Sequence, residues 1–100
     1  MNDATASAAL AEQGRQEYER GAFLAAAKLF DQAAQAYRDA GDPLNAAEMK
    51  NNQSVALLQG GKAGDALQAT EGTEEIFANA GDLKRQGISI SNRAAALEGM

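Results

Sequence analysis

The tripeptide Ala-Gly-Asp occurs twice in this chain, at residues 40–42 and again at residues 80–82. The residues that follow also correspond at an offset of forty, so that Asn52 after the first copy matches Asn92 after the second. A period in this range is typical of chains in which each helical unit buries its apolar face only by packing on the next unit. This repeat constrains the possible fold more than any other feature of the sequence.

The spacing of apolar residues predicts helices on both sides of each tripeptide. Within residues 23–37 apolar side chains recur at steps of three and four, which places them on one helix face. Gly41 predicts a helix end, Asp42 an N-cap, and Pro43 the first position of the next helix. No strand pattern competes. We expect five antiparallel helices, at about 5–20, 23–40, 43–59, 62–79 and 83–98.

The fourth of these helices has the weakest intrinsic propensity. It contains Gly64, Gly72 and two threonines, Thr70 and Thr73, and each glycine costs up to about 1 kcal/mol relative to alanine. The sequence leaves open whether the helix continues through Gly72. We expect the segment to depend on packing against its neighbours.

The composition excludes several classes of function. The 100 residues include no histidine, cysteine or tryptophan, which removes the most common general base, thiol nucleophiles and most zinc ligands. The net charge is −5, and no cluster of lysine or arginine suits nucleic acid. No apolar run approaches the roughly 20 residues of a membrane span. We therefore expect a soluble, cytoplasmic, non-enzymatic protein with no cofactor or metal and no binding to nucleic acid or membranes.

The first forty residues resemble the tetratricopeptide repeat (TPR), a motif of two packed helices with small and aromatic residues at fixed spacing. The matching residues are Gly14, Tyr18, Gly21, Phe23, Ala26, Phe30 and Ala33. In the second unit Gly61 and Ala66 match. The motif positions that differ there are Ser54, Ala63, Thr70 and Thr73. A unit of forty residues is similar to a longer subtype of the family.

The resemblance implies an all-α fold of antiparallel helix pairs, a TPR-like α-solenoid with about five helices and two and a half repeats. The whole chain, 1–100, would form one domain. Repeat 1 would occupy about 5–40 and repeat 2 about 43–80, followed by a capping or half-repeat helix at about 83–98.

The resemblance also implies a concave groove in which an asparagine grips a peptide backbone. Asn52 and Asn92 stand at that position, and an amide can donate to a peptide carbonyl while accepting from its N–H. Alternatively, both asparagines merely bond to neighbouring helix ends or to water. The other groove residues implied by this placement are Arg15, Tyr18, Asn51, Val55, Leu58 and Ser91.

Charged residues bear on which peptide such a groove would accept. The family's clamp for C-terminal carboxylates uses lysine and asparagine at two positions of the first unit, where this chain has Ala11 and Arg15. That specialised function is therefore not expected. The cations that could still attract an acidic peptide are Arg15, Lys50, Arg85 and Arg93.

Three functional hypotheses follow from these observations. In the first, the chain is a protein-interaction module that binds a peptide or a partner helix in the groove. In the second, it is a homo-oligomer that assembles through its open C-terminal helix, where Ile88, Ile90 and Leu97 must pack inward, remain exposed or meet another chain. In the third, it is the N-terminal fragment of a longer TPR scaffold.

Overall fold

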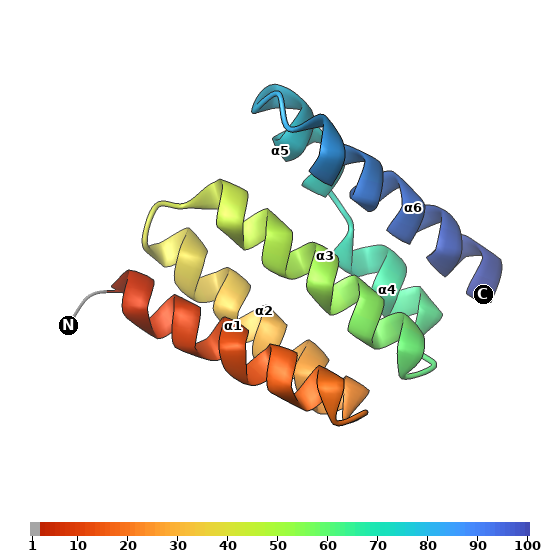
Figure 1. The fold of residues 1–100 in the computed structure, drawn as a ribbon. Coiled ribbons are helices and arrows are strands. Elements are labelled where there is room, and N and C mark those ends of the chain that lie inside the picture. Colours follow the sequence, from red (N-terminus) through yellow and green to blue (C-terminus); the bar gives the residue numbers. More distant parts are fainter. Residues whose placement is uncertain (1–2) are drawn as a thin grey trace.

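A computed structural model describes residues 3–100, and every regular element in that range is an α-helix (Figure 1). The arrangement confirms the predicted all-α class, and the three successive 17-residue helices at the N-terminal end run antiparallel to one another (Figure 1). None of the helices within residues 3–100 combines the length and apolarity that crossing a membrane requires. The helices are α1 (Asp3–Glu19), α2 (Phe23–Asp39), α3 (Pro43–Gln59), α4 (Ala63–Ala69), α5 (Thr73–Asn79) and α6 (Leu83–Gly99).

Four of the five connections between these helices are corners of the same design. At the first corner the N–H of Gly21 donates to the carbonyl of Tyr18, and the N–H of Ala22 donates to the carbonyl of Glu17. These bonds satisfy the last helical carbonyls, and the left-handed conformation they need suits glycine, which has no Cβ to clash. The corner glycines, each with φ between 73° and 82°, are Gly21, Gly41, Gly61 and Gly81.

Two of the corners also contain an aspartate that caps the next helix. The carboxylate of Asp42 accepts from the N–H of Asn45 at 3.1 Å, and that of Asp82 accepts from the N–H of Arg85 at 3.1 Å. Pro43 occupies the start of α3. The predicted roles of the second corner's residues are confirmed, and the same chemistry recurs at the fourth corner.

The predicted fourth helix is instead two short helices, α4 and α5, so that residues 3–100 contain six helices rather than five. Gly72, with φ of +79°, directly precedes α5. The hydroxyl of Thr70 donates to the carbonyl of Leu67 at 2.7 Å, and that of Thr73 donates to the carbonyl of Thr70 at 2.9 Å. Such local bonds compete with the helical ladder. Figure 1 shows the resulting non-helical segment between α4 and α5.

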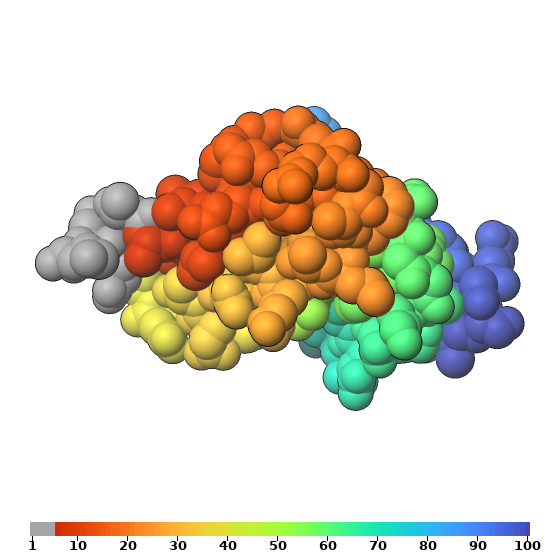
Figure 2. All heavy atoms as spheres, turned by 90° about the horizontal axis from the view of Figure 1, so that it is seen from below, coloured from red at the N-terminus to blue at the C-terminus, as the bar shows by residue number. Residues whose placement is uncertain are grey.

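The helices form a slab that measures 41 × 33 × 18 Å. Since a helix with its side chains is about 10 Å wide, the smallest dimension corresponds to two layers. α1 packs on α2, α2 packs on α3, and α3 packs on α4, α5 and α6. The N-terminal pair and α6 therefore lie at opposite ends of the molecule, as Figure 2 shows from below.

Small residues allow the helices of the core to approach closely. A Cβ at Gly14 would lie only 2.8 Å from Cε1 of Phe30, so the ring occupies the space that a side chain on α1 would need. In the second half Ser54 stands at the matching position, and its buried hydroxyl donates to the carbonyl of Ala66 at 2.8 Å. The buried residues of α2 are Ala26, Ala27, Phe30, Ala33 and Ala34.

Candidate functional site

A hollow of about 450 Å³ lies between α1 and α3 and is closed below by α2. Arg15 and Tyr18 are three residues apart on α1, and Asn52 and Val55 are three apart on α3, so each pair shares a helix face. Because α1 and α3 both pack near α2, these two faces border the same space. The structure thus brings together four of the eight residues that the sequence assigns to a groove.

Asn52 places an amide side chain in the lining of this hollow. Within residues 3–100 its half-buried side chain makes no hydrogen bond. Its amide can therefore donate to one group and accept from another at the same time. A free amide beside apolar walls is suited to bind the main chain of a peptide.

The other two asparagines of the predicted groove lie between α3 and α6 instead. Asn51 is only 4% exposed, and its side-chain oxygen accepts from the hydroxyl of Ser89 at 2.9 Å. The side-chain nitrogen of Asn92 donates to the backbone carbonyl of Asn51 at 3.2 Å. Both amides thus join two helices of the chain, and Asn92 bonds to a neighbouring helix as in the alternative that the sequence left open for it.

Leu58 and Ser91 also lie outside the hollow. Leu58 is partly buried near the end of α3. A Cβ added at Gly99 would lie 3.2 Å from its Cδ1. Ser91 is exposed on α6. Neither residue contributes to the lining of the α1–α3 hollow.

The hollow includes residues that the sequence assigned elsewhere or did not single out. Phe30 and Tyr37 line it from α2, and Met49 lines it from α3. The seven-residue spacing of Phe30 and Tyr37 places both on one face of α2, and this could have indicated a shared role. The ring of Tyr18 packs edge-on against Phe23, with centroids 5.2 Å apart, which orients it at the end of the hollow.

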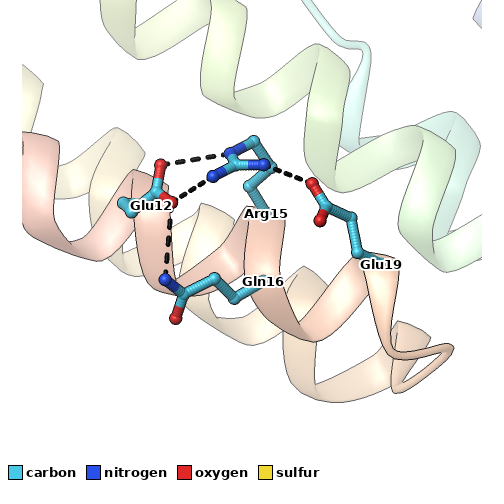
Figure 3. Close-up of polar contacts among 4 residues, drawn as sticks. All are labelled: Glu12, Arg15, Gln16 and Glu19. Atoms are coloured by element: carbon cyan, nitrogen blue, oxygen red, sulfur yellow. Dashed lines mark hydrogen bonds and ion pairs between the residues drawn. The ribbon is translucent and has the colours of Figure 1, made fainter.

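A network of ion pairs lies along α1 at the edge of the hollow (Figure 3). The guanidinium of Arg15 bonds to the carboxylates of Glu12 and Glu19, and Gln16 donates to Glu12 at 3.4 Å. The hydrogen bond from Arg15 lowers the pKa of Glu12, and the same bond raises the pKa of Arg15. Two carboxylates against one guanidinium leave this edge with a net charge of about −1.

Two further cations that could attract an acidic peptide are also paired with carboxylates. Nζ of Lys50 lies 3.2 Å from Asp31, and Arg85 lies 3.4 Å from Glu48. These contacts join neighbouring helices, α2 with α3 and α3 with α6. The side chains therefore have a local role that reduces the positive charge available to a ligand.

A second hollow, of about 520 Å³, opens between α4, α5 and α6 where the predicted fourth helix is interrupted. Its lining includes Glu71, Glu74 and Glu75, with Arg93 on the α6 side. In the part of the chain that the structure describes, no group of acidic side chains is arranged to hold a metal ion. None of the eight predicted groove residues lines this hollow.

Comparison with models of protein families finds no match to this chain. No curated protein and no solved structure matches it either.

Proposed function

We propose that this chain is a non-catalytic protein-interaction module of the tetratricopeptide kind, which binds a peptide or a partner helix in the α1–α3 hollow. The observation that carries the proposal is the unpaired amide of Asn52 beside aromatic walls. The four matching corners, at intervals of twenty residues, support the solenoid interpretation of the fold.

The lining of the hollow suits a ligand with both a polar main chain and apolar side chains. Tyr18, Phe30 and Tyr37 offer large apolar surfaces, and the two tyrosines also carry hydroxyl groups. Asn52 can pair with a peptide N–H and carbonyl together, as a neighbouring strand or turn would. Apolar contact would supply most of the affinity, and the amide would fix the register.

The charge at the edge of the hollow bears on which ligands are favoured. Arg15 is shared between Glu12 and Glu19, so it offers little free positive charge to a C-terminal carboxylate. The net negative edge favours a neutral or basic segment over an acidic one. The acidic peptide considered from the sequence is therefore the less favoured ligand.

Selection from a displayed library of random peptides against the immobilised chain tests this proposal. We expect enriched peptides with apolar residues and few acidic ones. Binding of a synthesised peptide, followed by fluorescence anisotropy, should weaken about tenfold in Asn52→Ala, which corresponds to about 1.4 kcal/mol for the lost amide contacts. Val55→Glu should weaken it further, because a carboxylate would be placed on an apolar wall.

Asn79→Ala is the matched control, since Asn79 is exposed on α5 and does not line the hollow. It should leave peptide affinity unchanged. Circular dichroism should report the same helix content for all three variants. If no peptide is enriched, or if enriched peptides bind Asn52→Ala and Val55→Glu as tightly as the parent chain, the proposal is wrong.

A further inference from the structure

An apolar stripe on α6 is largely exposed within residues 3–100, and Leu97, its last large member, also borders the hollow between α4, α5 and α6. The members of the stripe follow one another at steps of four and three residues, the spacing of a helix-packing seam. The three large ones are 76%, 48% and 53% exposed, in chain order. The stripe consists of Leu83, Gly87, Ile90, Ala94 and Leu97.

The corresponding faces of the earlier helices are covered within the chain. Forty residues before Ala94, Ser54 is buried against the carbonyl of Ala66. Forty residues earlier again, Gly14 is buried against the ring of Phe30. On α1 and α3 this face thus receives the helix that follows, and on α6 it is largely exposed among the described residues.

Gly87 is a further reason to expect a partner helix on this face. A glycine in the middle of a helix lowers helix stability, and close approach of another backbone is one structural role that offsets this cost. A Cβ at Gly87 would meet no atom within 4 Å in this chain. Packing within the single chain therefore gives Gly87 no role.

We propose that two copies of this chain associate through α6, with the two α6 helices antiparallel. One antiparallel register places Ile90 opposite the partner's Ala94, and Leu97 opposite the partner's Gly87. Each layer of the contact then combines one large and one small residue, which lets the helices interlock. The stripe is complementary to itself in this register.

The charges beside the stripe support the same register. It brings Lys84 next to the partner's Glu98 and, by the two-fold symmetry, Glu98 next to the partner's Lys84. Neither side chain makes an ion pair within residues 3–100. Two complementary pairs across the axis therefore favour a second copy as the occupant.

Arg93 flanks the stripe on its other side and would lie near the partner's Arg93. Glu74 and Glu75 line the same hollow as Arg93, and their charges offset this repulsion. α6 has 17 residues, so the contact is about 25 Å long. Stable interfaces bury roughly 1,200–2,000 Å², and one helix pair buries less, so we expect weak association with a Kd of about 0.1–1 mM.

Sedimentation equilibrium of the chain between about 0.01 and 1 mM tests this proposal. The mean mass should rise from 10.4 kDa toward twice that value. Ile90→Ser should raise the Kd at least about tenfold, because it removes the central apolar layer. Ile88→Ser is the matched control, since Ile88 is an exposed isoleucine of the same helix outside the stripe, and it should leave the Kd unchanged.

The charge pair tests the register independently of the apolar layer. Lys84→Glu alone and Glu98→Lys alone should each raise the Kd about threefold, and the double charge reversal should restore it. A monomer at every concentration would overturn the proposal, as would equal effects of Ile88→Ser and Ile90→Ser. Failure of the double reversal to restore association would overturn the antiparallel register. None of these residues lines the α1–α3 hollow, so failure of this proposal and failure of peptide binding in the hollow are distinguishable.

Discussion

The two halves of this chain pack the same helix positions with different chemistry. In the N-terminal pair, Gly14 leaves room for the ring of Phe30, and the contact is apolar. In the C-terminal half, Ser54 replaces the glycine and donates a buried hydrogen bond to the carbonyl of Ala66. At this matched position the first half has a ring packed closely against a backbone, and the second half has a directed hydrogen bond.

The two halves also differ in the helix that packs on this position: α2 in the first half and the α4–α5 segment in the second. α2 is continuous for 17 residues, whereas its counterpart in the second half is interrupted at Gly72. Thr70 and Thr73 direct their hydroxyls to local carbonyls there, and both side chains are buried. A shared corner design therefore accommodates a break in the helix between corners when the polar groups at the break are hydrogen-bonded.

Removing the buried ring of each half should have the largest effect on stability. Phe30→Ala and Phe77→Ala should each lower the free energy of unfolding by about 3–5 kcal/mol, the usual cost of replacing a buried phenylalanine by alanine. Chemical denaturation followed by far-UV circular dichroism measures this loss. Phe77 is fully buried in α5, so it is the matched site in the second half.

The two tyrosines provide a probe that separates the halves. Tyr18 and Tyr37 both lie in the N-terminal pair and pack against its core cluster, so their fluorescence reports mainly on that part of the molecule. Met49 and Ala56 of α3 belong to the same core cluster as α2, and we therefore expect one cooperative transition. If Phe77→Ala lowers the dichroism midpoint but not the fluorescence midpoint, the halves unfold separately and the expectation is wrong.

Loss of the Ser54 hydrogen bond should have the next largest effect on the free energy of unfolding. Ser54→Ala removes the donor to the Ala66 carbonyl at a site that is 1% exposed, and should cost about 1–2 kcal/mol. Ser91→Ala on exposed α6 should change stability by less than about 0.5 kcal/mol. Denaturation at low protein concentration measures both. Equal effects of the two variants would show that the buried hydroxyl adds nothing to this half.

Replacing Gly14 by alanine should change the free energy of unfolding by a smaller amount. The sign of the change shows whether Phe30 fills the space beside Gly14. Alanine at Gly14 would push its Cβ against Phe30, at a cost of about 1–3 kcal/mol, while its better helix propensity returns about 1 kcal/mol. We expect a net loss of about 1 kcal/mol in thermal or chemical unfolding. Gly87→Ala, with open space around it, should instead gain about 1 kcal/mol. A gain in both variants would contradict the close fit at Gly14.

Much of the fold follows from local chemistry that the sequence displays. Gly41, Asp42 and Pro43 predict a helix end, a cap and a helix start, and the structure has all three, with α3 ending at Gln59 as expected. The interruption at Gly72 was harder to predict. Residues with low helix propensity there could still have been held in a helix by packing, so the propensities alone did not decide the matter.

The candidate site was predictable only where one helix face decides it. Arg15 and Tyr18, or Asn52 and Val55, fall on one face by spacing, and each pair lines the hollow. Asn92 matches Asn52 in the repeat, yet it bonds to the carbonyl of Asn51 because α6 packs directly against α3. Equivalent positions acquire different surroundings from the helix packed beside them, and a repeat in the sequence does not specify that neighbour.

The smallest expected effect is the pH dependence of the stability that the Glu12–Arg15 ion pair contributes. Among the described residues, only the α1 wall of the hollow has such a pair. Glu12 and Arg15 on α1 correspond, at the offset of forty, to Asn52 and Val55 on α3, which do not titrate. Because Arg15 holds the pKa of Glu12 below its ordinary value of 4.5, the ion pair stabilises the fold above that value. The contribution is lost as the pH falls through the lowered pKa of the folded state.

NMR chemical shifts of the Glu12 carboxyl group, measured from about pH 2 to about 7, test whether Arg15 lowers its pKa. This range spans the ordinary pKa of glutamate. Arg15→Gln should return the pKa of Glu12 toward 4.5. Added salt should have a similar but partial effect, since both groups are exposed and their attraction is screened. A Glu12 pKa that stays equally low in Arg15→Gln would show that the guanidinium is not its cause. In that case Arg15 would be free to attract an acidic peptide, and the preference for neutral or basic peptides would need a different basis.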